Sequence, residues 1–328
     1  MTECDKWLGD YLHSGGMAAS VTETIRKRDG KVRGAALEIL SIVDDWRAAT
    51  VGGFVSGLFL WESCCLPSLL YNAGSWTGIS KEAEMQAEGL QSWYLRLLLR
   101  QGPGVPTGSM LWETGLLSVP LLVYREKLCL ALHIVRLRED TLAKKMWTEQ
   151  QLYDWPGLAR EVRDICEQLG VEQVEDTKMT SKCYRSEVTA ACHRMNEARL
   201  RKQMEGKQKC AKILCDEYGQ KEYFNFKTPS QVRMYFSTRV SMLPIAGNFS
   251  RDNRFRRTDW LCRCGAREQE EHIRSHCELY RDIREKYGCL DDDEKLVAFF
   301  GEVLQRRDDQ DEKEKEEKRR RRRKEKEE

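Results

Sequence analysis

The sequence predicts a mainly α-helical protein. Two observations predict this fold class. Apolar residues recur at intervals of three and four in several long stretches, and Ser, Thr, Gly and Pro signals mark where these stretches begin and end. A chain of 328 residues with 41 % hydrophobic residues is also long enough to bury a sizeable core.

Composition limits the classes of protein to which the chain can belong. Residues 51–70, the most apolar stretch, contain Glu62 and Pro67, so we expect no membrane span. The first residues include acids and lack the order of a signal peptide, which favours an intracellular protein, nuclear or cytoplasmic. The 13 cysteines are scattered through predicted helices, and most are expected to be reduced core thiols.

The net charge of +2 is divided unevenly along the chain. Residues 306–328 hold 12 basic and 10 acidic residues, which leaves 43 of each sign in the rest of the chain. Because the body is neutral, binding to nucleic acid would need local basic patches.

The first elements are predicted from local signals. Residues 7–12, followed by two glycines, indicate a short strand and a turn. Ser20 and Glu23 indicate a capping box that starts a helix reaching residue 46. Its apolar stripe is Ile25, Val32, Ala36, Ile39, Ile42 and Val43. Residues 54–70 are apolar all round, which is typical of a buried helix.

An amphipathic helix follows, with Ser80 as its N-cap and the Gly and Pro residues of 101–106 after its end. Its stripe is Ala83, Ala87, Leu90, Tyr94 and Leu97. A short helix over 109–114 and a longer one over 120–138 complete a compact helical unit.

The second half is predicted to contain one helix in a connector, 157–169, and a long charged helix over 181–205. The stripe of the long helix is Val188, Ala191, Cys192, Met195, Ala198 and Leu200. Thr228 to Gln231 form a helix-start signal for a helix that reaches Leu243.

These elements predict a helical bundle, a second helical segment, a small metal-binding knuckle and a charged tail. The expected parts are 1–18, a strand; 19–138, the bundle; 139–180, a connector; 181–249, a helical region; 250–290, the knuckle with its basic flank; 291–305, a terminal helix; and 306–328, the tail. The tail contains the basic run Lys318 to Lys324, which indicates a nuclear import signal, a phosphate-binding arm, or a plain solvated helix or disordered segment.

The strongest chemical signal is a CCHC pattern formed by Cys262, Cys264, His272 and Cys277. Zinc binds about four thiolate and imidazole ligands in a tetrahedron, and a short chain segment with this spacing can supply them. His276 is a competing ligand. The alternative is a chance cluster of core cysteines, but the surrounding residues are charged. Because the protein fills all four positions, we expect a structural zinc ion rather than a catalytic one.

Residues 233–263, the arginine–aromatic segment, precede and overlap this pattern. Its candidate nucleic-acid-binding residues are Arg233, Arg239, Arg251, Arg254, Arg256, Arg257, Arg263 and Trp260. Arginine forks bind phosphates and aromatic rings stack on unpaired bases, which favours RNA or single-stranded DNA as the partner. The alternative is a solvated face whose aromatic residues, such as Tyr235 and Phe236, belong to the core.

Sequence motifs of common enzymes are absent. The chain has no GxxxxGK[ST], GxSxG, HExxH or post-strand GxGxxG motif, so we expect neither catalysis by the chain on its own nor a small-molecule substrate. Asp44 and Asp45 lie in a predicted helix rather than a polymerase hairpin.

The order of these motifs resembles the C-terminal region of a non-LTR retrotransposon reverse transcriptase. Residues 6–10 (KWLGD) resemble the strand at the end of the palm, and Leu58 to Trp76 resemble a thumb segment, although Ser75 replaces the usual Glu. Leu111 to Pro120 resemble the following Glu-x-Gly to Pro run, and the CCHC knuckle falls where the family places it.

The resemblance implies that residues 1–18 are a remnant strand of the palm and that residues 19–138 are a helical thumb-like bundle. It also implies that the catalytic aspartates and the endonuclease lie upstream of this chain, and that thumb helices and knuckle contact nucleic acid. We therefore expect a nucleic-acid-binding fragment. The alternatives are a zinc-stabilised protein-interaction module, and part of an RNA-directed DNA polymerase whose palm is encoded upstream.

Overall fold

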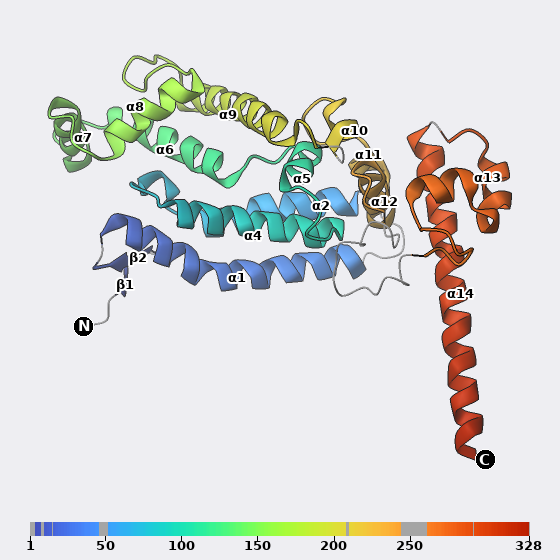
Figure 1. Ribbon diagram of the computed structural model, residues 1–328. Coiled ribbons are helices and arrows are strands. Elements are labelled where there is room, and N and C mark those ends of the chain that lie inside the picture. Colours follow the sequence, from blue (N-terminus) through green and yellow to red (C-terminus); the bar gives the residue numbers. More distant parts are fainter. Residues whose placement is uncertain are drawn as a thin grey trace. The chain divides into compact units, whose positions relative to one another are not determined.

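The structure, a computed structural model, confirms a mainly α-helical fold (Figure 1). It describes residues 4–7, 10–14, 16–45, 52–207, 210–243, 261–290 and 292–327. The chain forms two compact units, Met1–Pro229 and Ser230–Glu328. No helix within the described ranges has both the length and the apolar character that a bilayer crossing needs.

The first unit starts with a two-stranded hairpin. Strands β1 (Cys4–Trp7) and β2 (Asp10–His13) pair antiparallel, with Trp7 opposite Asp10. The single strand predicted over 7–12 is therefore wrong, because the chain reverses direction between Trp7 and Asp10.

Helix α1 (Met17–Asp45) starts one turn earlier than predicted. Ser20 is not its N-cap: its hydroxyl donates to the Gly16 carbonyl at 2.9 Å and accepts from the His13 amide at 2.8 Å. The predicted capping box is wrong because Ser20 ties the helix to the hairpin instead. The predicted apolar stripe is buried except at Ile42, which is exposed.

The apolar stretch 54–70 forms three consecutive helical pieces rather than one helix. They are α2 (Gly53–Leu60), the π-helical turn η1 (Trp61–Cys65) and α3 (Leu66–Leu69), and the short turn η2 (Ala73–Ser75) follows. Phe54 and Trp61 are fully buried, but Phe59 is exposed, so the stretch is not buried on every face.

The centre of the unit is formed by α4 (Lys81–Leu99), α5 (Thr107–Thr114) and α6 (Val119–Val135). Ser80 caps α4 as predicted, because its hydroxyl accepts from the Ala83 amide at 3.1 Å. The predicted stripe of α4 is buried except at Leu97. The Tyr94 ring stacks on Trp61 at 4.3 Å, and its hydroxyl donates to the Gly57 carbonyl at 2.7 Å. These contacts join α4 to α2 and η1.

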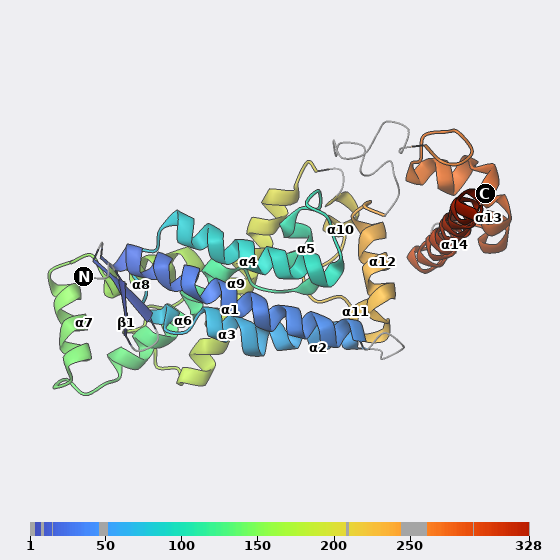
Figure 2. The same cartoon turned by 90° about the horizontal axis from the view of Figure 1, so that it is seen from below.

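The predicted connector contains two helices, α7 (Leu142–Leu152) and α8 (Leu158–Leu169), rather than one. They are followed by α9 (Ser181–Met204), α10 (Ala211–Leu214) and α11 (Tyr223–Phe226). In the order α1, α4, α6, α9, each long helix contacts the next (Figures 1 and 2). Helices α8 and α9 both pack on α6, so all three helices belong to the first unit.

The buried stripe of α9 also differs from the prediction. Met195 is half-buried and Ala198 is exposed, whereas Asn196 is fully buried. The Asn196 amide donates to the Leu116 carbonyl at 3.1 Å and to the Tyr218 hydroxyl at 2.9 Å. A polar residue therefore takes a core position, where both acceptors of its side-chain NH₂ group lie.

The second unit contains α12 (Pro229–Arg239), the π-helical turn η6 (His272–His276), the 3₁₀ turn η7 (Glu278–Tyr280), α13 (Arg281–Tyr287) and α14 (Asp293–Glu327). The terminal helix and the charged tail are thus one continuous helix. The apolar part of α14 packs in a core with members from η6, η7 and α13, and Met234 of α12 packs against this core. The core residues are Leu243, Cys262, Ile273, Cys277, Tyr280, Ile283, Leu290, Leu296, Phe299, Phe300, Val303 and Leu304.

Two glycines that end helices provide a matched test of packing in the first unit. Gly115 (φ +69°) and Gly170 (φ +64°) both adopt the left-handed conformation, but only Gly115 faces other backbone, where an added Cβ would lie 2.7 Å from the Gln220 nitrogen. Gly170→Ala should cost about 1 kcal/mol of unfolding free energy from the conformation alone. Gly115→Ala should cost about 1–3 kcal/mol more from overpacking. Urea unfolding measures both, and equal losses would contradict a rigid contact at Gln220.

Candidate metal centre

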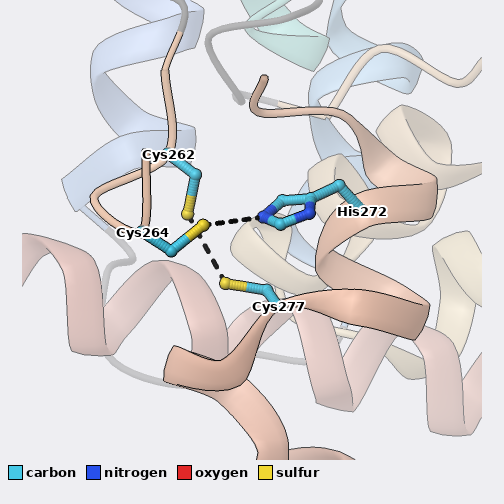
Figure 3. Close-up of side chains that lie close together, drawn as sticks. All are labelled: Cys262, Cys264, His272 and Cys277. Carbon is cyan, nitrogen blue, oxygen red and sulfur yellow. Dashed lines mark hydrogen bonds between the residues drawn. The ribbon is translucent and has the colours of Figure 1, made fainter. Parts of the chain in front are cut away.

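The first two cysteines of the CCHC pattern lie on a tight backbone turn. The Gly265 amide donates to the Cys262 carbonyl at 2.8 Å, and the Cys262 amide donates to the Ala266 carbonyl at 2.7 Å. Gly265 has φ +90°, a conformation that glycine adopts without strain. Leu261 and Arg267 form an isolated antiparallel bridge at the base of the turn. This turn, the predicted knuckle, presents both thiols on one side (Figure 3).

The other two residues lie at the ends of a π-helical turn. Helical structure begins at Glu270, as predicted, and η6 follows over His272–His276. The Cys277 amide donates to the His272 carbonyl at 2.8 Å, which is the i to i+5 bond of a π-helix. On an α-helix, two side chains five positions apart point in directions about 140° apart around the helix axis. The wider π-turn brings them much closer to one face, so both side chains point to the knuckle.

The structure brings the four predicted ligands together, and they can hold a metal ion. Their ligand atoms all lie within 4.8 Å of one another. Cys262 Sγ is 3.5 Å from Cys277 Sγ, and Cys264 Sγ is 3.2 Å from His272 Nε2 (Figure 3). The competing ligand His276 is exposed and does not belong to this group. We refer to Cys262, Cys264, His272 and Cys277 as the cysteine–histidine cluster.

The cluster lies half inside the apolar core of the second unit. Cys262 and Cys277 are buried, His272 is half-buried and Cys264 is exposed. Burial raises the pKa of the Cys262 and Cys277 thiols, whereas the backbone amide of Ala266 lowers the pKa of the Cys264 thiol. A bound cation favours the thiolate form at all three positions, so metal binding would release protons.

Two arginines stabilise the π-turn, and neither was among the site residues predicted from the sequence. Arg284 donates to the Ile273 carbonyl at 3.0 Å, and Arg274 donates to the Leu290 carbonyl at 2.9 Å. They connect η6 to α13 and to the residues just before α14. Their spacing from the ligands carries no recognisable pattern, because these contacts depend on tertiary packing.

Four residues of the arginine–aromatic segment have partners or burial within the second unit. Arg239 is mostly buried and lies 3.5 Å from Asp293, and Arg263, which is exposed, pairs with Asp311 and Glu314 of α14. Tyr235 and Phe236 are buried. These two rings therefore belong to the core, and binding of nucleic acid by the segment stays a prediction.

The remaining candidates of this segment divide into two groups. Arg233 is half-buried on α12. Arg251, Arg254, Arg256, Arg257 and Trp260 lie outside the described residues.

Replacing a ligand of the cluster should weaken the second unit far more than replacing a nearby cysteine. Cys277→Ser removes a fully buried ligand, whereas Cys289→Ser changes an exposed thiol of the same unit. We expect residues 261–304 of Cys277→Ser, and of the wild type after chelation, to become sensitive to limited proteolysis. Cys289→Ser should remain resistant until a chelator is added. Resistance that survives both chelation and Cys277→Ser would contradict a metal-supported fold.

Comparisons with protein-family models, with curated proteins and with solved structures found no match to this chain. Its functional interpretation therefore depends on the geometry of its own residues.

Proposed function

We propose that the cysteine–histidine cluster binds one Zn²⁺ ion. With bonds of about 2.3 Å to sulfur and 2.0–2.1 Å to nitrogen, tetrahedral zinc separates two sulfurs by about 3.8 Å and a sulfur and a nitrogen by about 3.6 Å. The distances of 3.5 Å between Cys262 and Cys277 and 3.2 Å between Cys264 and His272 are close to these edges. This agreement is the observation that carries the proposal.

The proposed ion has a structural role. Three thiolates and one imidazole fill a tetrahedron, which leaves no position for a catalytic water or a substrate. Its energetic effect is to hold the knuckle against η6 and the helical core. The chain would then act by binding another molecule.

We further propose that this partner is single-stranded nucleic acid, RNA or DNA, bound through basic side chains on α14. Lys318, Arg319 and Arg320 are exposed on this helix, and the basic run continues to Lys324. Because the apolar part of α14 packs on the core that contains Cys262 and Cys277, the zinc ion would anchor the helix that carries these charges. Phosphate groups attract such a run without regard to sequence. The resemblance to a non-LTR reverse transcriptase also supports this partner.

A zinc-stabilised protein-interaction module is the second candidate. It is favoured by the ion pairs of Arg239 and Arg263 and by the burial of Tyr235 and Phe236. Residues engaged in this way support the fold and are less available to phosphates and bases.

Metal analysis of the purified chain tests the identity of the ion. We expect one zinc ion per chain in the wild type and in Cys289→Ser, and loss of that ion in Cys262→Ser/Cys264→Ser. Inductively coupled plasma mass spectrometry measures the content. A metal other than zinc, or zinc that remains in the double variant, would contradict the proposed site.

Charge reversal on α14 tests nucleic-acid binding. The variant Lys318→Glu/Arg319→Glu/Arg320→Glu should bind a fluorescent 15-nucleotide RNA more weakly than the wild type. The dependence of log K on log salt should become shallower by about 2, since about 0.7 counterions are released for each phosphate contact of a single strand. Fluorescence anisotropy at several salt concentrations measures both quantities.

The control reverses three exposed lysines of the first unit, Lys145, Lys178 and Lys182, with the same change in net charge. Its salt dependence should match that of the wild type. If both triple variants weaken binding equally, α14 has no special role. If the wild type fails to bind, the interaction-module proposal is favoured.

A further inference from the structure

A small pocket with a basic lining lies on the first unit, beside α1. Its volume is about 250 Å³. Strand β2, helix α1, helix α3 and the residue that follows the α3 C-cap contribute its lining: Tyr11, Lys27, Arg28, Lys31, Pro67, Ser68 and Tyr71. The lining thus combines three cations, two phenol rings and a hydroxyl, with no carboxylate among these described residues.

The two lysines of the pocket lie one turn apart on the same face of α1. Like charges at this spacing repel each other, so an anion placed near both would relieve the repulsion. Lys27 lies 3.6 Å from Glu23. However, both oxygens of Glu23 already accept from the Arg26 guanidinium at 2.7 Å. Glu23 therefore neutralises Lys27 only in part.

The third cation, Arg28, is committed to the structure of the pocket. Its guanidinium donates to the Leu69 and Tyr71 carbonyls at 3.1 and 2.8 Å and to the Asp10 carboxylate at 2.6 Å. Asp10 also accepts from the Asn72 amide at 3.1 Å. Among the described residues, Asp10 is thus occupied by its own partners, and the positive charge of Lys31 and part of that of Lys27 remain for a ligand.

The two tyrosines of the pocket are positioned by contacts with residues of α1. The Arg28 guanidinium lies 5.7 Å from the centre of the Tyr71 ring, and this ring is 54 % exposed. The backbone amide of Tyr11 donates to the Thr24 hydroxyl at 2.9 Å. The backbone of each tyrosine is therefore fixed before a ligand binds. Ordering the two rings on binding would then cost little conformational entropy.

We propose that this pocket binds a nucleotide, with its phosphate between Lys27 and Lys31 and its base against Tyr71. Lysine ammonium groups bind phosphate as point charges, and an exposed aromatic ring stacks on a base regardless of base identity. The volume accommodates a phosphate with part of the attached nucleoside. The site lies in the first unit and uses neither the zinc ion nor α14, so it goes beyond the function proposed above.

Isothermal titration calorimetry of the full chain with AMP, adenosine and inorganic phosphate tests the pocket. We expect AMP to bind more tightly than either fragment. Lys27→Gln/Lys31→Gln should weaken AMP binding at least tenfold, and Tyr71→Leu should weaken AMP binding but not phosphate binding. Because both lysines are exposed, their replacement leaves the core intact, which circular dichroism checks. The control Lys145→Gln/Lys182→Gln, which changes two exposed lysines outside the pocket, should bind AMP as the wild type does.

Two sources of the nucleotide are distinguished by titrating a short oligonucleotide in parallel. Tighter binding of the oligonucleotide that depends on Lys27 and Lys31 identifies a nucleotide within a strand, and equal binding identifies a free nucleotide. AMP binding that is undetectable, or unchanged in Lys27→Gln/Lys31→Gln, would overturn the proposal. The α14 triple variant should bind AMP normally, so failure of the α14 proposal and failure of the pocket proposal are separate results.

Discussion

The second unit depends on the convergence of four side chains from two short pieces of backbone. The knuckle is a polar turn with one isolated bridge, and its Arg263 pairs with Asp311 and Glu314 of α14 at the surface. Cys262 and Cys277 nevertheless belong to the same apolar core as Phe299 and Phe300 of α14. A cation bound to both thiols would therefore link the knuckle to the core directly. Small cores often need such a link, because they bury too little apolar surface to offset the loss of chain entropy.

This convergence requires a local departure from ideal helix geometry. An α-helical turn would place His272 and Cys277 on widely different faces, and η6 avoids this by the wider i to i+5 bonding. Arg284 supports the turn by donating to the Ile273 carbonyl. The cost of the π-turn is thus offset by contacts that form only after α13 has packed. Ligand geometry and tertiary packing are in this way coupled in the same few residues.

The ligands were predictable because they lie within 16 consecutive residues, where spacing alone limits the possible geometry. The helices were predictable for a similar reason, since Ser80 and the apolar stripes act within a few turns. Predictions failed where a distant partner decides the outcome. Ser20 caps nothing because the hairpin uses its hydroxyl, and Asn196 is buried because the Leu116 carbonyl and Tyr218 accept its hydrogen bonds. Arg263 likewise has distant partners, because α14 supplies the acids that pair with it.

Three arginines that join structural elements differ in use from the two lysines of the pocket, and this difference bears on where ligands bind. The planar guanidinium forks of Arg28, Arg274 and Arg284 donate to backbone carbonyls and so join elements that are distant in sequence. Lys27 and Lys31 remain at the surface, where a mobile ammonium group stays hydrated until an anion replaces its water. A count of basic residues therefore overestimates the surface available to phosphates. The cations that remain available are those beside a preformed pocket, as on α1, and those exposed on α14 at Lys318 to Arg320.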